Sequence, residues 1–459
     1  MNKIILRLSL LLALFATSLH ATIRNDDSCD VSVMPAATLL LPYFEVDPTP
    51  NAAARTTLFT VINTTSTPQI AKVTIWTDWS YPVLEFQIYL TGYDVQAINL
   101  RDVLGRGVIL ASSNKSTPGS RSLATNSKFL ADAGTTCGNL PTQIPPSIIQ
   151  DIANALTAGR NTLCNTTQIG GVHALMTGYA TIDVVASCRY GFITDASTFD
   201  TLLYDNVLTG DWQIINPDPA TGNLASGSPL VHIRAIPEGG NAGERVDTNL
   251  PYTFYDRFGG APRRLMDRRQ PLPSAFAARY MQGGGATFNT NFIMWREGRT
   301  GPTATCPDYA AQNGQLPITG LVRFDERENP TTVGSCLICS PTNIVPLFTP
   351  STSSVSSTNT LFPPLTSGDT SGWMVFNLDN GGATTYGAAN GRDFKTGSST
   401  VTGPRPSQNW VVPVLIAEGR YSAAREATAL ANGCSPSPPP DQLFPSNIPL
   451  IGPGPNPTP

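Results

Sequence analysis

The chain has 459 residues, of which 41% are hydrophobic and 14% are charged, against a charged share of about 25% in typical soluble proteins. So few charges exclude a charge-rich helical rod, and so many apolar residues exclude a wholly disordered chain. The formal net charge of −4 excludes the strongly basic surface that nucleic-acid-binding proteins use, so we expect no nucleic-acid partner.

Residues 1–21 have the pattern of a secretory signal peptide. Lys3 and Arg7 make the start positive, and Leu8–Ala16 is an apolar run too short to cross a bilayer as a helix. We therefore expect an exported protein, located in the periplasm, on the cell surface or outside the cell. After cleavage of the signal peptide we expect no transmembrane anchor.

Residues 22–112 are expected to form a β-sandwich-like domain. Apolar and polar residues alternate with a period of two in four short runs, a pattern typical of half-buried antiparallel strands that follow one another as a meander. The predicted strands are Thr56–Asn63, Ala71–Thr77, Leu84–Leu90 and Val95–Arg101. Their length and spacing resemble an immunoglobulin-like or fibronectin-like antiparallel sandwich, a scaffold that implies no particular function.

Residues 113–170 are rich in small polar residues and predict a loop-rich insertion with one short helix. The helix is expected at Pro146–Ala158, where Ile148, Ile152 and Leu156 recur every four residues. Proline opens this segment and Gly159 closes it, which are the usual positions of these two residues at helix ends.

Residues 171–434 predict a second β-rich domain with a few short helices, so the fold class is mainly β. The expected strands are Tyr179–Val185, Gln213–Asn216, Leu230–Ile236, Phe288–Trp295, Trp373–Leu378 and Trp410–Ala417. Short helices are expected at Ser274–Gln282 and Ala423–Ala431, and a Ser/Thr/Pro-rich loop at 341–371. Residues 435–459 contain ten prolines and predict a disordered tail.

The eight cysteines remain in the mature chain, and an even number in an exported protein favours disulfides. They are Cys29, Cys137, Cys164, Cys188, Cys306, Cys336, Cys339 and Cys434. Cys137 and Cys164 enclose a short segment and are our expected local pair. Cys336 and Cys339 have the spacing of a redox pair or of half a zinc site, but the second close pair of a zinc site is missing. We therefore expect structural bridges, with no metal and no cofactor.

Three residues are candidates for catalysis. Glu238 follows an apolar run and enters a glycine turn, where it would serve as one of two carboxylates in a glycoside hydrolase. His232 precedes it in the same run, and Asp205 lies in a polar segment before Trp212. The alternative for all three is structural: a buried histidine with satisfied hydrogen bonds, and carboxylates paired with arginines.

Two further groups are candidates for ligand binding. The first is an arginine cluster that would clamp a carboxylate, a phosphate or a sulfated sugar, namely Arg263, Arg264, Arg268 and Arg269. Asp267 lies inside this cluster, which favours internal ion pairs instead. The second group is Trp76, Trp79 and Tyr81, whose rings would stack on sugars if exposed, although aromatic residues at strand ends more often pack in a core.

Four strings together resemble a group of uncharacterised exported bacterial proteins, and the similarity covers most of the mature chain. The strings are Trp76–Leu90, Tyr204–Trp212, His232–Gly240 and Phe288–Gly298. The resemblance implies no activity, ligand or catalytic residue. We therefore predict a non-enzymatic or structural protein that interacts through its surface, with envelope proteins or extracellular glycans as partners. The alternatives are a carbohydrate-active hydrolase with paired carboxylates and a glycan- or anion-binding module.

Overall fold

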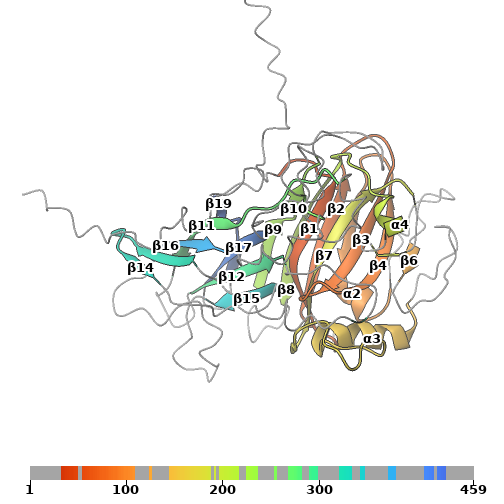
Figure 1. Cartoon of the computed structure of the whole chain (residues 1–459), viewed down its shortest axis with the longest axis horizontal. Coiled ribbons are helices and arrows are strands. Elements are labelled where there is room, and N and C mark those ends of the chain that lie inside the picture. Colours follow the sequence, from red (N-terminus) through yellow and green to blue (C-terminus); the bar gives the residue numbers. More distant parts are fainter. Residues whose placement is uncertain are drawn as a thin grey trace, which may run out of the picture.

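The fold is mainly β, as the sequence predicts, and it is built from antiparallel sheets (Figure 1). The structure is a computed structural model. It describes residues 33–49, 54–108, 124–126, 144–187, 191–192, 196–216, 224–235, 253–255, 267–281, 289–297, 306, 320–332, 342–346, 371–378, 408–417 and 421–430. The predicted signal peptide, the proline-rich tail and six of the eight cysteines lie outside these residues.

The larger end of the molecule is a sandwich of a six-stranded and a four-stranded sheet, whose apolar inner faces pack together. The six-stranded sheet has the order β10 (Val231–Ile233), β1 (Thr38–Val46), β7 (Met176–Val185), β3 (Gln69–Thr77), β4 (Pro82–Leu90) and β6 (Ala124–Asn126). The four-stranded sheet has the order β5 (Val95–Asn99), β2 (Thr56–Asn63), β8 (Leu208–Asn216) and β9 (Leu224–Pro229).

The thinner end contains two further sheets. The five-stranded sheet has the order β14 (Pro330–Thr332), β13 (Gly320–Asp325), β16 (Ser371–Asn377), β11 (Ala275–Met281) and β19 (Thr428–Ala429). The four-stranded sheet has the order β15 (Thr342–Pro346), β12 (Asn289–Arg296), β17 (Asn409–Ala417) and β18 (Tyr421–Ala424). Aromatic contacts join the two sheets: Phe276 lies 5.9 Å from Trp410 between ring centres, and Phe292 lies 5.0 Å from Phe376.

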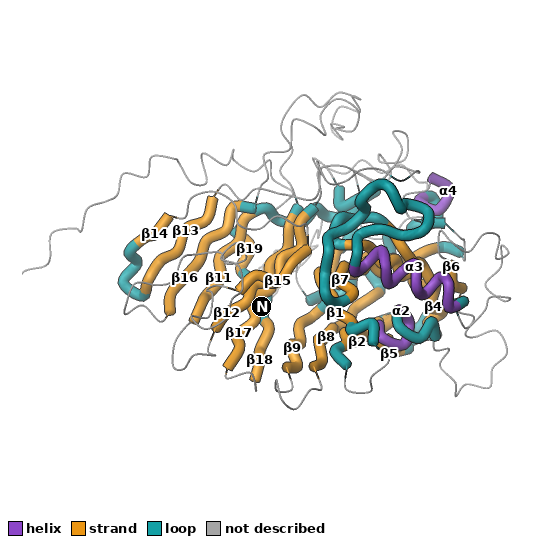
Figure 2. The backbone as a smooth tube through the Cα atoms, turned by 90° about the horizontal axis from the view of Figure 1, so that it is seen from below, coloured by secondary structure: helices purple, strands orange, loops and turns teal. Residues whose placement is uncertain are grey.

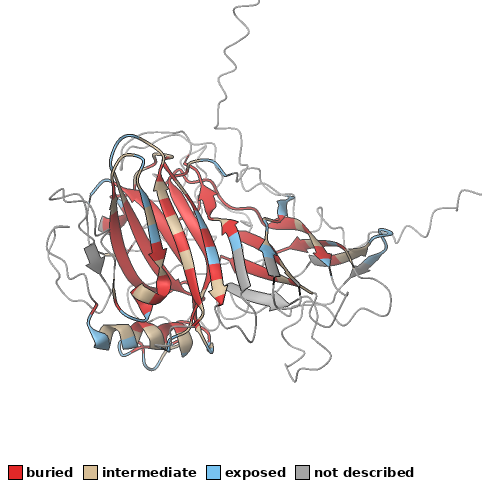
Figure 3. Cartoon of the chain, turned by 180° about the vertical axis from the view of Figure 1, so that it is seen from behind, coloured by how far each residue is buried: buried red, intermediate tan, exposed pale blue. Residues whose placement is uncertain are grey.

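The two ends share one hydrophobic core. A single cluster of buried apolar residues extends from Ala36 near β1 to Ala427 near β19, and the buried strand segments continue from one end to the other (Figure 3). Strand β9 of the larger sandwich lies beside β18 of the smaller one (Figure 2). The molecule is therefore an elongated pair of β layers with a continuous apolar interior.

The described residues include three short helices: α2 (Leu100–Leu104), α3 (Pro146–Thr157) and α4 (Ala196–Phe199). Helix α3 confirms the helix predicted from residue 146. It buries Ile152, Ala155 and Leu156 and leaves its other side in contact with solvent (Figure 3). In the described part of the chain, no helix is long and apolar enough to cross a membrane.

Two predicted helices are wrong. Residues 275–281 of the segment Ser274–Gln282 form strand β11, which pairs along its whole length with β16. Ala423–Ala431 contains the end of β18 and all of β19. Alanine, arginine and methionine favour helices in isolation, but pairing with a neighbouring strand buries alternate side chains and overrides that weak preference.

The sheets do not follow the predicted division of the chain at residue 112. Strand β2 pairs with β5 and β8, whereas β3 pairs with β4 and β7, so the consecutive strands do not form one meander. Both sheets of the larger sandwich therefore require strands from beyond residue 170. The end of the predicted strand Val95–Arg101 belongs to α2, and the predicted loop 341–371 contains β15.

Candidate functional site

The six-stranded sheet is buried on both faces, not half-buried as its alternating pattern predicts. One face is apolar and meets the four-stranded sheet. The opposite face is polar: Asp183 on β7 lies opposite both Thr38 on β1 and Lys72 on β3, and residues opposite each other in antiparallel strands share a face. These three side chains are fully buried. The polar face is therefore the place where the chain gathers buried charge.

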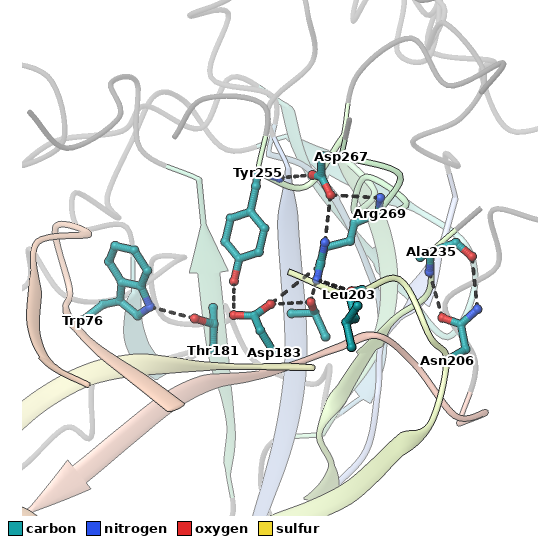
Figure 4. A network of polar contacts seen from close by, with 10 residues as sticks. Trp76, Thr181, Asp183, Leu203, Asn206, Ala235, Tyr255, Asp267 and Arg269 are labelled. Carbon is teal, nitrogen blue, oxygen red and sulfur yellow. Dashed lines mark hydrogen bonds and ion pairs between the residues drawn. The ribbon is translucent and has the colours of Figure 1, made fainter. Parts of the chain in front are cut away.

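Arg269 is the centre of this buried charge (Figure 4). Its Nη1 lies 3.0 Å from Asp267 Oδ1, and its Nε lies 3.7 Å from Asp183 Oδ1. Its Nη2 donates to the carbonyl oxygen of Leu203 at 3.0 Å, and its Nε also donates to the hydroxyl of Thr38. The guanidinium thus lies between two carboxylates that come from different parts of the chain.

Tyr255 and Thr38 complete the hydrogen bonding of Asp183. The Tyr255 hydroxyl donates to Oδ2 at 2.8 Å, and the Thr38 hydroxyl donates to Oδ1 at 2.5 Å. The backbone N–H of Tyr255 also donates to Asp267 Oδ2 at 3.1 Å. Residues 253–255 and 267–270 therefore lie over the sheet and enclose its polar face.

The electrostatics of the cluster follow from this enclosure. Burial raises the pKa of the Asp183 carboxyl, while Arg269 and the Thr38 and Tyr255 hydroxyls oppose that rise. Burial lowers the pKa of Arg269, but the carboxylates of Asp267 and Asp183 outweigh it, and the pKa lies above its ordinary value. Arg269 therefore stays charged and forms internal ion pairs with Asp183 and Asp267. The position of Asp267 inside the arginine cluster predicts such pairing.

Arg268 and Asp205 lie beside this cluster. The guanidinium carbon of Arg268 lies 4.7 Å from the centre of the Tyr204 ring, which also faces Arg269 at 5.2 Å. Burial raises the pKa of Asp205, and Arg268 acts against that rise. Arg268 and Arg269 are both fully buried, so neither presents the exposed clamp that anion binding requires.

His232 lies on β10 and is buried, as the structural alternative predicts. Its Nε2 lies 2.9 Å from the Thr209 hydroxyl, and burial lowers its pKa from 6.5 to about 4. The imidazole is therefore neutral at neutral pH. Among the described residues no carboxylate lies within hydrogen-bond distance of the His232 ring, so His232 and Asp205 are not brought together as a catalytic pair.

The aromatic group at the end of β3 is buried rather than exposed. Trp76 stacks on Tyr179 of β7 with ring centres 5.7 Å apart, and its indole N–H donates to the Thr181 hydroxyl at 3.0 Å (Figure 4). Trp79 and Tyr81 are buried in the turn that follows. These three rings are therefore not available to stack on sugars, because they pack in the interior of the protein.

Lys72 and Glu85 form a second buried ion pair on the same face. Their Nζ and Oε2 atoms lie 2.8 Å apart, and both side chains are almost completely buried. Gly191 caps the pair: its N–H donates to Glu85 Oε1 at 2.9 Å, and its carbonyl accepts from Lys72 at 2.9 Å. The backbone of Gly191 thus gives each member of the pair a further hydrogen bond.

The pair of Asp78 and His173 is not found by sequence reasoning. His173 Nε2 lies 2.9 Å from Asp78 Oδ2, and Asp78 Oδ1 accepts from the N–H of Gly171 at 2.8 Å. The side chain of His173 is 21% exposed. This contact joins the segment after α3 to the turn between β3 and β4. The two residues are 95 positions apart, so only the folded chain reveals them.

Several predicted residues lie outside the described part of the chain, namely Glu238, Arg263 and Arg264. The predicted pair Cys137–Cys164 is wrong, because Cys164 is bonded to Cys306. Helix α3 lies between Cys137 and Cys164 in the sequence, and the fold places Cys306 next to Cys164. Among the described residues no group of three or more His, Cys, Asp or Glu side chains is placed to hold a metal ion.

The buried charges Arg269, Asp183, Asp267, Lys72 and Glu85 thus form enclosed pairs that hold the covering segments on the six-stranded sheet. Comparison of the sequence and structure with protein-family models, curated proteins and solved structures finds no match.

Proposed function

We propose that this protein is exported and acts by binding other molecules at its surface, in the cell envelope or outside the cell, without catalysing a reaction. The observation that carries the proposal is the enclosure of Asp183, Asp267 and Arg269, which are 0% exposed. Charged side chains at this depth contact only other parts of the chain, whereas catalysis needs contact with the substrate. The part of this molecule that meets other molecules is its extended β surface.

Export is supported by the pattern of residues 1–21 and by the Cys164–Cys306 bond, since disulfides persist in oxidising compartments. An immunoglobulin-like scaffold stays a prediction. Two facing antiparallel sheets support it, but together they have more strands than the seven to nine, roughly, of immunoglobulin domains. The hydrolase alternative depends on Glu238, for which no described contact gives support.

Export is tested by expressing the full chain in a bacterial host, fractionating the cells and weighing the intact protein by mass spectrometry. We expect a chain without residues 1–21, recovered outside the cytoplasm, with Cys164 joined to Cys306. An unprocessed chain in the cytoplasm with free thiols at both positions would contradict export.

The absence of catalysis is tested with the same purified protein and a panel of nitrophenyl glycosides, esters and phosphates. We expect release of nitrophenol at the rate of the buffer alone. Turnover that survives purification and is abolished in an Asp183→Asn variant with an unchanged melting temperature would overturn the proposal. The buried network would then be the active site.

A further inference from the structure

Trp373 differs from the other tryptophans of the chain. It is 41% exposed, whereas the other five are at most 7% exposed. It lies on β16 between Gly372 and Met374, both of which face inward. A single exposed aromatic ring is common on protein surfaces and indicates no site by itself, so the neighbours of Trp373 decide whether it belongs to one.

The neighbours of Trp373 form a row across the five-stranded sheet. Arg279 on β11 and Phe324 on β13 lie directly opposite Trp373 on either side, and Phe324 lies opposite Pro330 on β14. Opposite residues in antiparallel strands share a face, so the row projects outward together. The guanidinium carbon of Arg279 lies 5.3 Å from the centre of the Trp373 ring, a cation–π contact that holds the ring in place.

Polar groups lie beside this row. Arg279 Nη2 donates to Glu326 Oε1, and the Ser371 hydroxyl donates to the same oxygen at 2.5 Å. The side chains of Arg279 and Glu326 are 41% and 48% exposed. The other N–H groups of Arg279 and the Oε2 atom of Glu326 have no partner among the described residues. Donors and acceptors therefore face solvent beside an aromatic ring.

The turn between β13 and β14 fixes Glu326 in this position. Asp325 Oδ1 accepts from the N–H groups of Arg327 and Asn329, both at 2.8 Å, and Oδ2 accepts from the Asn329 side chain at 2.8 Å. The Ser371 hydroxyl and Arg279 lower the pKa of the Glu326 carboxyl, which stays ionised at neutral pH. A site whose side chains are already held in place loses less conformational entropy when a ligand binds.

We propose that this outward face binds an uncharged saccharide, with one sugar ring packed against the exposed part of Trp373 that Arg279 does not cover and its hydroxyl groups bonded to Arg279 and Glu326. This inference rests on the proposed surface-binding function and names its ligand class. The C–H groups on one side of a sugar ring are slightly positive, so they are attracted to the electron-rich indole. Each sugar hydroxyl both donates and accepts, so it matches a guanidinium and a carboxylate that stand side by side.

The charges of the site select the ligand. Arg279 and Glu326 cancel each other, so the site offers no net attraction to phosphate or sulfate, and an uncharged saccharide fits better than an anion. An apolar protein partner would cover Trp373 and Phe324 but would bury the open donors and acceptors without partners, which costs free energy. A molecule rich in hydroxyl groups meets both requirements.

The test is isothermal titration calorimetry of the whole mature protein, residues 22–459 with its disulfides oxidised. The probes are six uncharged hexasaccharides: those of the cello, xylo, manno, chito, malto and laminari series. We expect at least one of them to bind, and Trp373→Ala to weaken that binding about ten-fold or more. Glu326→Gln keeps the size of the side chain and removes its charge, and we expect it to weaken binding a few-fold.

Tyr93→Asn is the matched control, because Tyr93 is an aromatic residue that is 70% exposed in the other sandwich. Its φ of 54° is a conformation that asparagine tolerates. We expect its affinity to equal that of the unaltered protein. Circular dichroism melting of each variant establishes that the fold is intact.

Two results would overturn the saccharide site: no binding to any of the six probes, or binding that Trp373→Ala leaves unchanged. If the unaltered protein instead sediments as a dimer and Trp373→Ala makes it a monomer, the face joins two copies. The saccharide site then fails while the surface-binding function stands. If the protein instead releases shorter saccharides from a bound probe, the saccharide site is supported and the proposal of a non-catalytic function is wrong.

Discussion

Arg269 is held between two carboxylates in a region that water does not reach. Removing it leaves Asp183 and Asp267 buried without their cation, and this is the main energetic consequence, not the loss of a favourable attraction. We expect Arg269→Met to lower the free energy of unfolding by about 3–5 kcal/mol. Denaturation in urea, followed by tryptophan fluorescence, measures this difference.

Arg106 provides the matched control for that experiment. It pairs with Asp102 at 2.9 Å, but its side chain is 56% exposed, and exposed pairs contribute at most about 1 kcal/mol. We expect Arg106→Met to change the unfolding free energy by less than that. Equal losses in the two variants would contradict the view that burial makes the Arg269 cluster important for stability.

His232 gives the fold a dependence on pH. Burial lowers its pKa from 6.5 in a solvated histidine to about 4 in the folded protein. Between these values the unfolded chain binds a proton that the folded chain does not, so this histidine makes stability fall as the pH drops from 6.5 toward 4. The shift corresponds to roughly 3 kcal/mol at the acid end.

The measurement compares unfolding free energies of the unaltered protein and His232→Gln at several pH values. Glutamine stays uncharged and can bond to the Thr209 hydroxyl. We expect the difference between the two proteins to favour the variant progressively below pH 6.5 and to be constant above it. Parallel curves over the whole range would show that His232 does not titrate as its burial requires.

At the scale of strands, the pairing of β2 with β8 depends on the absence of a side chain at Gly210. A Cβ atom at this position would lie 2.0 Å from the carbonyl oxygen of Thr60 on the paired strand. Because a backbone atom cannot move aside without separating the strands, we expect Gly210→Ala to cost about 1–3 kcal/mol of unfolding free energy.

Gly227 on the neighbouring strand β9 is the control, since the nearest atom to a Cβ there lies 3.7 Å away. We expect Gly227→Ala to be neutral or slightly stabilising, because alanine restricts the unfolded chain. Equal effects of the two alanines would mean that strand glycines matter here through backbone freedom alone and not through space.

Where the alternating pattern is long, the position of a strand could be predicted from the sequence. The strands with which it pairs could not. The prediction of Thr56–Asn63 agrees with β2, and α3 begins at the predicted proline. The sequence predicts a helix where β11 forms. The alanines of this segment are compatible with either structure, and pairing with β16 decides for the strand. Nor does alternation show that Lys72 and Asp183 are covered, since covering segments come from residues far along the chain.

At the scale of the whole molecule, we expect one cooperative unfolding transition. The apolar core is continuous between the sandwiches, and Trp295 of β12 packs against Tyr179 of β7 with ring centres 5.8 Å apart. Differential scanning calorimetry should give a single peak whose calorimetric and van't Hoff enthalpies agree. Two separate peaks would show that the sandwiches are independent domains, which is closer to the division predicted from sequence.

The candidate binding face illustrates the same limit for function. Sequence reasoning selects Trp76 and Trp79 because they lie close together, yet folding buries both of them. Trp373 stands alone in the sequence, and its partners Arg279 and Glu326 are 94 and 47 positions before it. What makes Trp373 a candidate is its outward position opposite Arg279, and this follows from strand register rather than from any local motif.

The bond between Cys164 and Cys306 spans 142 positions, and this distance has a consequence for oxidative folding if the chain is exported as we propose. A chain that crosses the membrane with its N-terminus first delivers Cys137, Cys164 and Cys188 to the oxidising side well before Cys306. Any bond that Cys164 forms before residue 306 has emerged is non-native, and the native bond then has to form from it by thiol–disulfide exchange. Production of the correctly bonded protein should thus be limited by an isomerase that reshuffles bonds, not by the oxidase that first makes them.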